Sequence, residues 1–448
     1  MLTKQTVLCT AFLFSTGTLF AAQPGSMAQT ASVNFDGDWA YAINIPAPDA
    51  PNPTAPVIAA GASSASIQTG AWANYFQKLA PLMKNDGLYD AGTDNLALLV
   101  DGPQVIGSVV PDVKNAREFI DIEVFAWEDN DIGAQFRDLL AQKVKEGLKV
   151  RVILDQMGSD LINPLGAARK FADSMQKDGI DVKVRPAEPL HLDHRKVMVM
   201  DDAKGGLVAY TGGMNIGDNY QRNWHDQQTR VLGPAINRLH QSFIDDWATL
   251  TGEHLSGFPS IAPEDGARTY VITHVGGDSD QNIKQAYLLA INTARSLIRI
   301  EDPYFTDDDV IAALIKAAQA KVRVQLIVPA QDNKQVTLSA FRSHYPDMLK
   351  AGVEVYEYQP RMEHMKVSVM DHLWATVGSS NLDPESLKYN NEMNLLVLDP
   401  AFASQMDTRI FDKDIPQSVR IAPGYKPSAA DDADGHLPFL APEPVTLK

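Results

Sequence analysis

Short apolar segments between residues 119 and 360 occur twice along the chain, in the same order. Their β-branched residues either alternate with polar ones or run together, which is typical of buried strands. The segments are 119–127 with 297–305, 148–155 with 320–328, and 178–186 with 351–360. Amphipathic helical patterns separate them, and helices between short apolar strands favour a mainly parallel sheet with crossover helices. The pattern therefore predicts an α/β fold.

The repetition also predicts how the chain is organised. Two copies of one unit suggest two lobes related by a pseudo-two-fold axis. A stretch containing Gly, Pro and Ser near residues 252–268 marks their junction, and residues 71–84 have the spacing of an amphipathic packing helix. The expected segments are a signal peptide at 1–22, a leader with this helix at 23–94, lobe one at 95–255, lobe two at 268–415 and a Pro-rich tail at 416–448.

The first 22 residues have the layout of a secretory signal peptide. Lys4 precedes an apolar run that ends in small residues, and several Thr and Ser residues make this run a poor transmembrane anchor. Cleavage near Ala22 would also remove Cys9, the single cysteine of the chain. A chain without cysteine suits an oxidising compartment. The sequence therefore predicts a secreted or periplasmic protein.

A doubled motif carries the candidate chemistry. The pattern H-x-K-x-x-x-x-D follows the third strand of each half, and an Asn and an acid follow it. From the first Asn to the second is 166 residues, and the two acids are also 166 residues apart, so the whole arrangement is repeated. The candidate site residues are His194, Lys196, Asp201, Asn215 and Asp226 in the first half, and His364, Lys366, Asp371, Asn381 and Glu392 in the second.

These residue types suit a phosphodiester. Alternate residues of a strand share a face, so each His lies beside its Lys, which supplies positive charge for phosphate oxygens. One imidazole can attack phosphorus to form a phosphohistidine, and the other can protonate the leaving alcohol. Asn215 and Asn381 can donate to phosphate, while Asp226 and Glu392 can each accept from the far ring nitrogen of a His. The equal spacings leave open which acid orients which His.

Composition narrows the possible functions. With 448 residues, of which 45% are apolar and 21% charged, the chain is not disordered or of low complexity. The net charge of −17 and the lack of any Lys/Arg run disfavour a protein that coats nucleic acid. A single cysteine excludes a disulfide framework and a thiolate metal cluster. We expect no cofactor, no metal and no nucleic-acid partner.

The chain resembles the phospholipase D superfamily, whose signature is the doubled H-x-K-x-x-x-x-D motif, and within it bacterial cardiolipin synthases and related secreted proteins. DHRKVMVMD, EHMKVSVMD and VGSSNLDPESLKYNNEMNL carry the resemblance, which covers roughly residues 95–415. The resemblance implies two α/β/α sandwich lobes of the phospholipase D fold, an active site at their interface and no metal requirement. It also implies that His194 is the nucleophile, that His364 is the general acid and base, and that Asp201 and Asp371 are mainly structural.

The motif does not choose among several reactions. We expect a phospholipase D-type phosphodiesterase or phosphatidyltransferase that acts on phospholipid headgroups at a membrane surface, with water or an alcohol as acceptor. Water would give phosphatidic acid, whereas the headgroup of phosphatidylglycerol would give cardiolipin. The alternatives are a cardiolipin synthase, a nuclease of the superfamily and an inactive lipid-binding module; intact His, Lys, Asn and acid in both halves argue against the last. Because one chain carries both half-sites, a monomer is expected.

Overall fold

The computed structural model describes residues 70–431, apart from 164–165, 189–190, 203, 259, 277–280 and 332. The predicted signal peptide at 1–22, the leader before residue 70 and the tail after residue 431 lie outside the described residues. Within the described part of the chain, none of the helices combines the length and the apolar composition that crossing a bilayer demands.

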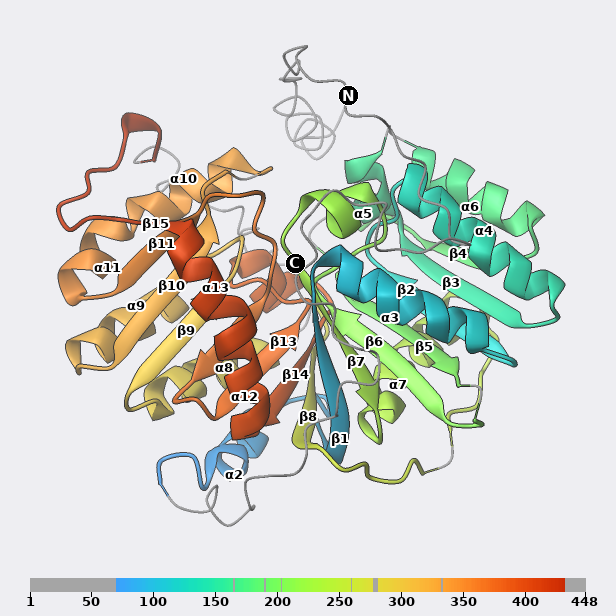
Figure 1. Ribbon diagram of the computed structural model, residues 1–448, viewed down its shortest axis with the longest axis horizontal. Coiled ribbons are helices and arrows are strands. Elements are labelled where there is room, and N and C mark those ends of the chain that lie inside the picture. The colour runs from blue at the N-terminus through green and yellow to red at the C-terminus, as the bar shows by residue number, and fades with distance from the viewer. Residues whose placement is uncertain are drawn as a thin grey trace, which may run out of the picture. The chain divides into compact units, whose positions relative to one another are not determined.

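A single mixed sheet connects both halves of the chain (Figure 1). At its centre β1 (Leu88–Val100) pairs antiparallel with β8 (Ala267–His274). Outward from this pair, the first half runs β7 (Gln227–Leu232), β6 (Leu207–Gly212), β5 (Lys196–Asp201), β2 (Phe119–Val124), β3 (Lys149–Asp155) and β4 (Asp181–Arg185). The second half runs β14 (Glu392–Leu398), β13 (Trp374–Gly378), β12 (Val367–Met370), β9 (Leu297–Glu301), β10 (Arg323–Pro329) and β11 (Glu354–Tyr358). The strand order is therefore the same in both halves.

The prediction of a mainly parallel sheet is wrong. Parallel pairing is confined to β2, β3 and β4 and to β9, β10 and β11. The strands that follow each motif histidine, β5 and β12, run antiparallel to β2 and β9, and short turns lead from them into the next strand. Strands joined by a short turn can pair only antiparallel, because a parallel pair needs a long crossover connection. Each half therefore joins a parallel crossover unit to an antiparallel meander.

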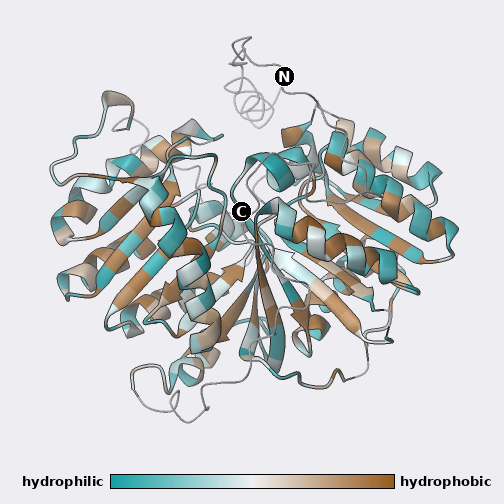
Figure 2. Cartoon of the chain, in the orientation of Figure 1, coloured by the Kyte–Doolittle hydropathy of each residue, from teal (hydrophilic) through white to brown (hydrophobic). Residues whose placement is uncertain are grey.

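Helices cover both faces of the sheet, as an α/β/α sandwich requires. One apolar layer packs α7 and α12 against strands of both halves, while two further layers fill the other face. Apolar residues are concentrated along the strands and the inner faces of the helices (Figure 2). The helices are α2 (Tyr75–Leu79), α3 (Asp101–Asn115), α4 (Asp131–Lys145), α5 (Gln156–Ile162), α6 (Ala167–Lys177), α7 (Ala235–Thr251), α8 (Asn282–Thr293), α9 (Asp308–Gln319), α10 (Gln335–Ser343), α11 (Tyr345–Ala351), α12 (Pro400–Met406) and α13 (Asp412–Asp414).

Two flanking segments pack onto the second half. The helix expected at 71–84 is shorter, with α2 continuing into the 3₁₀ turn Ala80–Leu82, and it buries Tyr75 and Leu79. Tyr75 donates a hydrogen bond to the Ala286 carbonyl of α8. The start of the Pro-rich tail forms β15 (Ser418–Arg420), which pairs with the edge strand β11. Both segments therefore pack on the second half, and the first of them reaches the motif residue Asp371 through Trp72.

Candidate active site

Both motif histidines lie where the two halves of the chain meet. His194 lies two residues before β5, and its backbone N–H donates to the Asn391 carbonyl of the other half. In the same way His364 lies shortly before β12, and its N–H donates to the His225 carbonyl. All four residues are buried. Backbone hydrogen bonds from the opposite half therefore fix the start of each motif.

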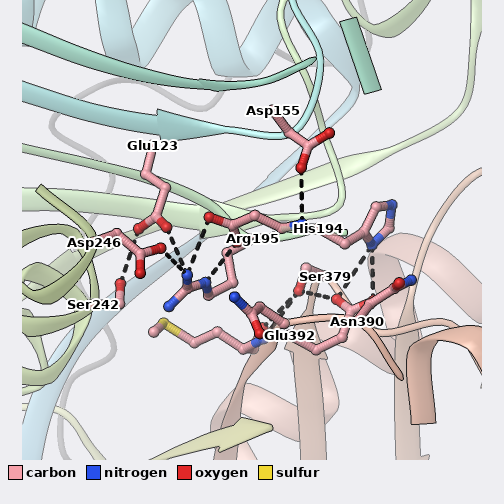
Figure 3. A network of polar contacts seen from close by, with 12 residues as sticks. Glu123, Asp155, His194, Arg195, Ser242, Asp246, Ser379, Asn390 and Glu392 are labelled. Atoms are coloured by element: carbon pink, nitrogen blue, oxygen red, sulfur yellow. Dashed lines mark hydrogen bonds and ion pairs between the residues drawn. The ribbon is translucent and has the colours of Figure 1, made fainter. Parts of the chain in front are cut away.

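Each histidine is oriented by an acid of the other half. The Nδ1 atom of His194 lies 3.0 Å from Oε1 of Glu392, and Nδ1 of His364 lies 2.7 Å from Oδ2 of Asp226. Figure 3 shows Glu392 and Ser379 beside His194. A carboxylate at Nδ1 holds the ring proton there, which leaves Nε2 as the reactive nitrogen. The spacing of the acids left this pairing open, and the structure assigns it.

Two buried lysines bring positive charge to the same place. Nζ of Lys196 donates to the His194 carbonyl at 2.5 Å, and Nζ of Lys366 donates to the His364 carbonyl at 2.6 Å. The Lys366 ammonium is also 3.3 Å from Nε2 of His364. Burial lowers the pKa of Lys196 to about 7, although Glu392 opposes this shift. A phosphate anion at the two histidines would meet both ammonium groups, as the sequence predicts.

A serine distinguishes the two acids. Ser379 Oγ donates a hydrogen bond to Glu392, whereas the corresponding position in the first half is Gly213. A Cβ atom at Gly213 would lie 2.4 Å from an Asp226 oxygen, so no larger residue fits there. Burial raises the pKa of Asp226 to about 7. Burial acts on Glu392 as well, but His194, Lys196 and the Ser379 hydroxyl hold its pKa below the usual value.

The two histidine–acid pairs therefore hold protons differently. Burial lowers the pKa of His194 to about 4, although Glu392 opposes this, so near neutral pH the pair is a neutral imidazole and an ionised carboxylate. Burial and the two lysines also lower the pKa of His364. The raised pKa of its partner Asp226 means that the second pair still retains a proton near pH 7. This difference suits His194 as nucleophile and the His364–Asp226 pair as proton donor.

The two asparagines are buried beside the motifs. Oδ1 of Asn215 accepts a hydrogen bond from the Ala126 N–H at 3.1 Å. The Asn381 amide nitrogen donates to Ser386 Oγ at 3.3 Å, whereas its Oδ1 atom has no partner among the described residues. These contacts fix both amides in place. Donation from either amide to phosphate stays a prediction.

The motif aspartates lie far from the histidines. Asp201 ends β5, seven residues beyond His194, which is about 23 Å along an extended strand. Its carboxylate accepts from the backbone N–H groups of Arg117, Glu118 and Phe119 at 2.8–2.9 Å. The structure thus places Asp201 outside the site, where it fixes the start of β2.

Asp371 does the same in the second half. Its carboxylate accepts from the backbone N–H groups of Arg295, Ser296 and Leu297 ahead of β9, and from the Trp72 indole N–H. The structural role that the resemblance implied for both aspartates agrees with these contacts.

Aromatic side chains enclose the histidines. The Phe125 ring centroid is 4.8 Å from the His194 imidazole, and the ring also lies under the Lys196 ammonium at 5.0 Å. Around the His364 imidazole are Trp224 at 5.0 Å, Tyr220 at 5.6 Å and Tyr304 at 6.0 Å. Phe125 and Trp224 carry no motif signal in the sequence, because their place at the site depends on how the two halves pack. Apolar walls of this kind exclude water and strengthen the electrostatic interactions inside.

Two histidines and two lysines, contributed equally by two halves and buried among aromatic rings, define the class of the protein as the phospholipase D superfamily. A family model described as "Cardiolipin synthase, PLD-like domain" matches residues 109–247 and 287–415. Cardiolipin synthase A of Pseudomonas syringae pv. syringae is 30% identical over 334 residues, which is 71% of this chain and 68% of that protein.

Two further relatives agree in sequence or in fold. A cardiolipin synthase of Alkalihalophilus pseudofirmus is 32% identical over 319 residues, covering 66% of this chain and 61% of that protein. The crystal structure of phosphatidylserine synthase from Haemophilus influenzae Rd KW20 has the same fold, with a TM-score of 0.60 at 15% identity, over 80% of this chain and 96% of that one. The chain belongs to the cardiolipin synthase family of PLD-like domains. It spans 68% and 61% of the lengths of the two cardiolipin synthases.

Proposed function

We propose that this protein transfers a phosphatidyl group from one phosphatidylglycerol to another, which forms cardiolipin and releases glycerol. The observation that carries the proposal is the crossed contact of His194 with Glu392 and of His364 with Asp226, each histidine lying beside a buried lysine. The names of the relatives support phosphatidyl transfer over hydrolysis.

In the first step, Nε2 of His194 attacks the phosphorus of the donor lipid. The P–N bond forms while the bond from phosphorus to the glycerol headgroup oxygen breaks, and the His364–Asp226 pair delivers its proton to that oxygen. The negative charge of the bound phosphate opposes the two lysines and favours a protonated His364. Lys196 and Lys366 stabilise the charge on the non-bridging oxygens.

In the second step, His364 removes a proton from a headgroup hydroxyl of the acceptor phosphatidylglycerol. The alkoxide oxygen bonds to phosphorus, the P–N bond breaks and His194 is restored. Water in place of this hydroxyl would give phosphatidic acid. The aromatic side chains Phe125, Trp224, Tyr220 and Tyr304 limit the access of water, which favours the alcohol.

Product analysis by mass spectrometry tests the proposal. The purified chain is mixed with vesicles of phosphatidylglycerol and phosphatidylethanolamine, beside His194→Ala and the control His254→Ala, which changes an exposed histidine outside the site. The expected products are cardiolipin and glycerol with the wild type and the control, and neither with His194→Ala. Phosphatidic acid alone would make the protein a hydrolase, and cleavage of an oligonucleotide instead of lipid would make it a nuclease. Lipid binding without any product would leave only a binding module.

A further inference from the structure

An arginine neutralises a buried acidic cluster behind His194. The guanidinium of Arg195 lies 2.9 Å from Glu123 and 2.8 Å from Asp193, and it also contacts Asp246. Arg185 contacts Asp246 at 2.7 Å. Figure 3 shows Glu123 and Asp246 gathered around Arg195, on the side away from the His194 ring. Three acids and two guanidinium groups therefore form a compensated network in the first half.

The second half repeats the acids of this cluster without the arginines. Glu301 corresponds to Glu123, because the two glutamates pair with Val367 and Val197 in the same strand register. Glu363 corresponds to Asp193, because each directly precedes its motif histidine. The two arginines have apolar or aromatic counterparts by the same register: Met365 corresponds to Arg195, and Tyr358 to Arg185. Both cations of the first cluster are thus missing at the matching positions of the second.

A histidine enters the second cluster. Nε2 of His225 lies 3.0 Å from Oδ2 of Asp414 and 4.0 Å from Oε1 of Glu301. One potential ligand atom of each of these three residues lies within 4.8 Å of the other two. The Nδ1 atom of His225 is 2.8 Å from Asp101, which is itself paired with Arg361. Histidines that bind a metal commonly donate their other ring N–H to a carboxylate in this way.

The carboxylate of Glu301 lacks hydrogen-bond partners among the described residues. Glu301 is fully buried, and both of its carboxylate oxygens are without such a partner. Glu363 forms a β-bridge with His225 through its backbone. Its Oε2 atom is also buried and has no hydrogen-bond partner among the described residues. Burial raises the pKa of Glu301 well above its usual value, because the ionised carboxylate carries a large free-energy penalty there, and a bound cation would remove this penalty.

We propose that His225, Glu301 and Asp414 bind a divalent transition-metal ion, for which Zn²⁺ is the best match, behind His364. One imidazole nitrogen and two carboxylates are a donor set that Zn²⁺ accepts, at about 2.0–2.2 Å each. Ligands at that distance in tetrahedral geometry lie ~3.4 Å from one another. The separations of 3.0 Å and 4.0 Å from Nε2 of His225 bracket this value.

The position of this site gives the ion a structural role. His225 is adjacent in sequence to Asp226 and belongs to the first half, whereas Glu301 and Asp414 belong to the second half. An ion bound to all three residues ties the two halves together next to the Asp226–His364 pair. The competing arrangement is an imidazolium at His225 that donates to both Asp101 and Asp414 and needs no metal.

Titration calorimetry with ZnCl₂ on the chelator-dialysed full chain distinguishes the two arrangements. The variants are Glu301→Gln, the matched control Glu123→Gln in the arginine-containing cluster, and Met365→Arg, which places the guanidinium of the first half into the second. We expect one Zn²⁺ per wild-type chain and a matching rise in Tm. The dissociation constant should rise at least ~10-fold in Glu301→Gln and stay unchanged in Glu123→Gln. Met365→Arg should bind no Zn²⁺.

Two outcomes overturn the site. One is a wild-type chain that binds no Zn²⁺ with a dissociation constant below about 100 µM. The other is a Glu301→Gln variant, folded by its melting curve, that binds Zn²⁺ as tightly as the wild type, which would assign the binding to other groups. If Glu301→Gln does not fold, Met365→Arg takes its place: a folded Met365→Arg variant that binds Zn²⁺ as tightly as the wild type overturns the site. Because the readout is metal binding, the result does not depend on the proposed lipid chemistry.

Discussion

The motif aspartate Asp201 offers a sharp test, because the structure separates its contribution to stability from the chemistry. In Asp201→Asn the side chain keeps its size but loses its charge. Its Oδ1 atom accepts from the Glu118 and Phe119 N–H groups and its Oδ2 atom from Arg117. The asparagine amide has only one oxygen. In one orientation this oxygen accepts from Glu118 and Phe119, and the NH₂ group faces the Arg117 N–H. In the other orientation the oxygen accepts from Arg117, and the NH₂ group faces the other two N–H groups.

The magnitude follows from these bonds. A hydrogen bond to a charged group contributes about 1.5–3 kcal/mol and a neutral one about 0.5–1.5 kcal/mol. Two bonds that change from charged to neutral lose about 1 kcal/mol each, and the third loses about 2 kcal/mol. Asp201 is only 6% exposed, so solvent screens little of this. The expected loss is about 4 kcal/mol in the free energy of unfolding, which lowers Tm by about 5 °C for a chain of this length.

Differential scanning fluorimetry and steady-state lipid turnover provide the assay. Asp201→Asn should melt about 5 °C earlier, whereas kcat per folded molecule should stay within about twofold of the wild type. Asp371→Asn should behave similarly, because its carboxylate caps the start of β9 in the same way. Asp138→Asn, at a side chain that is 65% exposed, is the control for charge alone. An unchanged Tm with a kcat lowered more than tenfold would place Asp201 in the chemistry and refute the reasoning.

Two further predictions concern the histidine–acid pairs. The value of kcat/KM should fall as the pH rises through about 7. Above that pH the Asp226–His364 pair loses its proton, and Lys196 loses its charge. A flat profile up to pH 9 would contradict this. Glu392→Gln should lower kcat per folded molecule by about 10²-fold or more, because the His194 ring proton loses its carboxylate acceptor; single-turnover trapping of the phosphohistidine locates the loss in the first step.

Much of the fold was predictable because its signals are local. Segment 119–127 contains β2, and segment 320–328 contains all of β10 but its last residue, since β-branched residues buried on both faces mark a strand wherever it lies. The family comparisons confirm the resemblance that the doubled motif indicated. Helical spacing did not predict the direction of β5 and β12. Among the described residues, no helix lies between β4 and β5 or between β11 and β12, so neither connection is a helical crossover.

The sequence predicted which residues form the site, but not which acid contacts which histidine. His194 and Glu392 are 198 positions apart and belong to opposite halves, so a spacing of 166 residues between the two acids cannot say which histidine each one meets. The Ser379 contact had a visible signal, namely G-S-S-N in the second half against G-G-M-N in the first. Phe125 and Trp224 had none, because aromatic residues near strand ends are most often part of the core.

The crossed pairings explain why the motif must occur twice in one fold. Each half supplies a histidine and a lysine, but the acid that orients the histidine comes from the other half: Glu392 for His194 and Asp226 for His364. Separating the halves would expose both imidazoles and leave both carboxylates without their histidines, so neither half retains a complete histidine–acid pair. The central β1–β8 pairing holds the halves in register. The difference between Gly213 and Ser379 gives the two acids different surroundings, because only Glu392 accepts a hydrogen bond from a serine at this position.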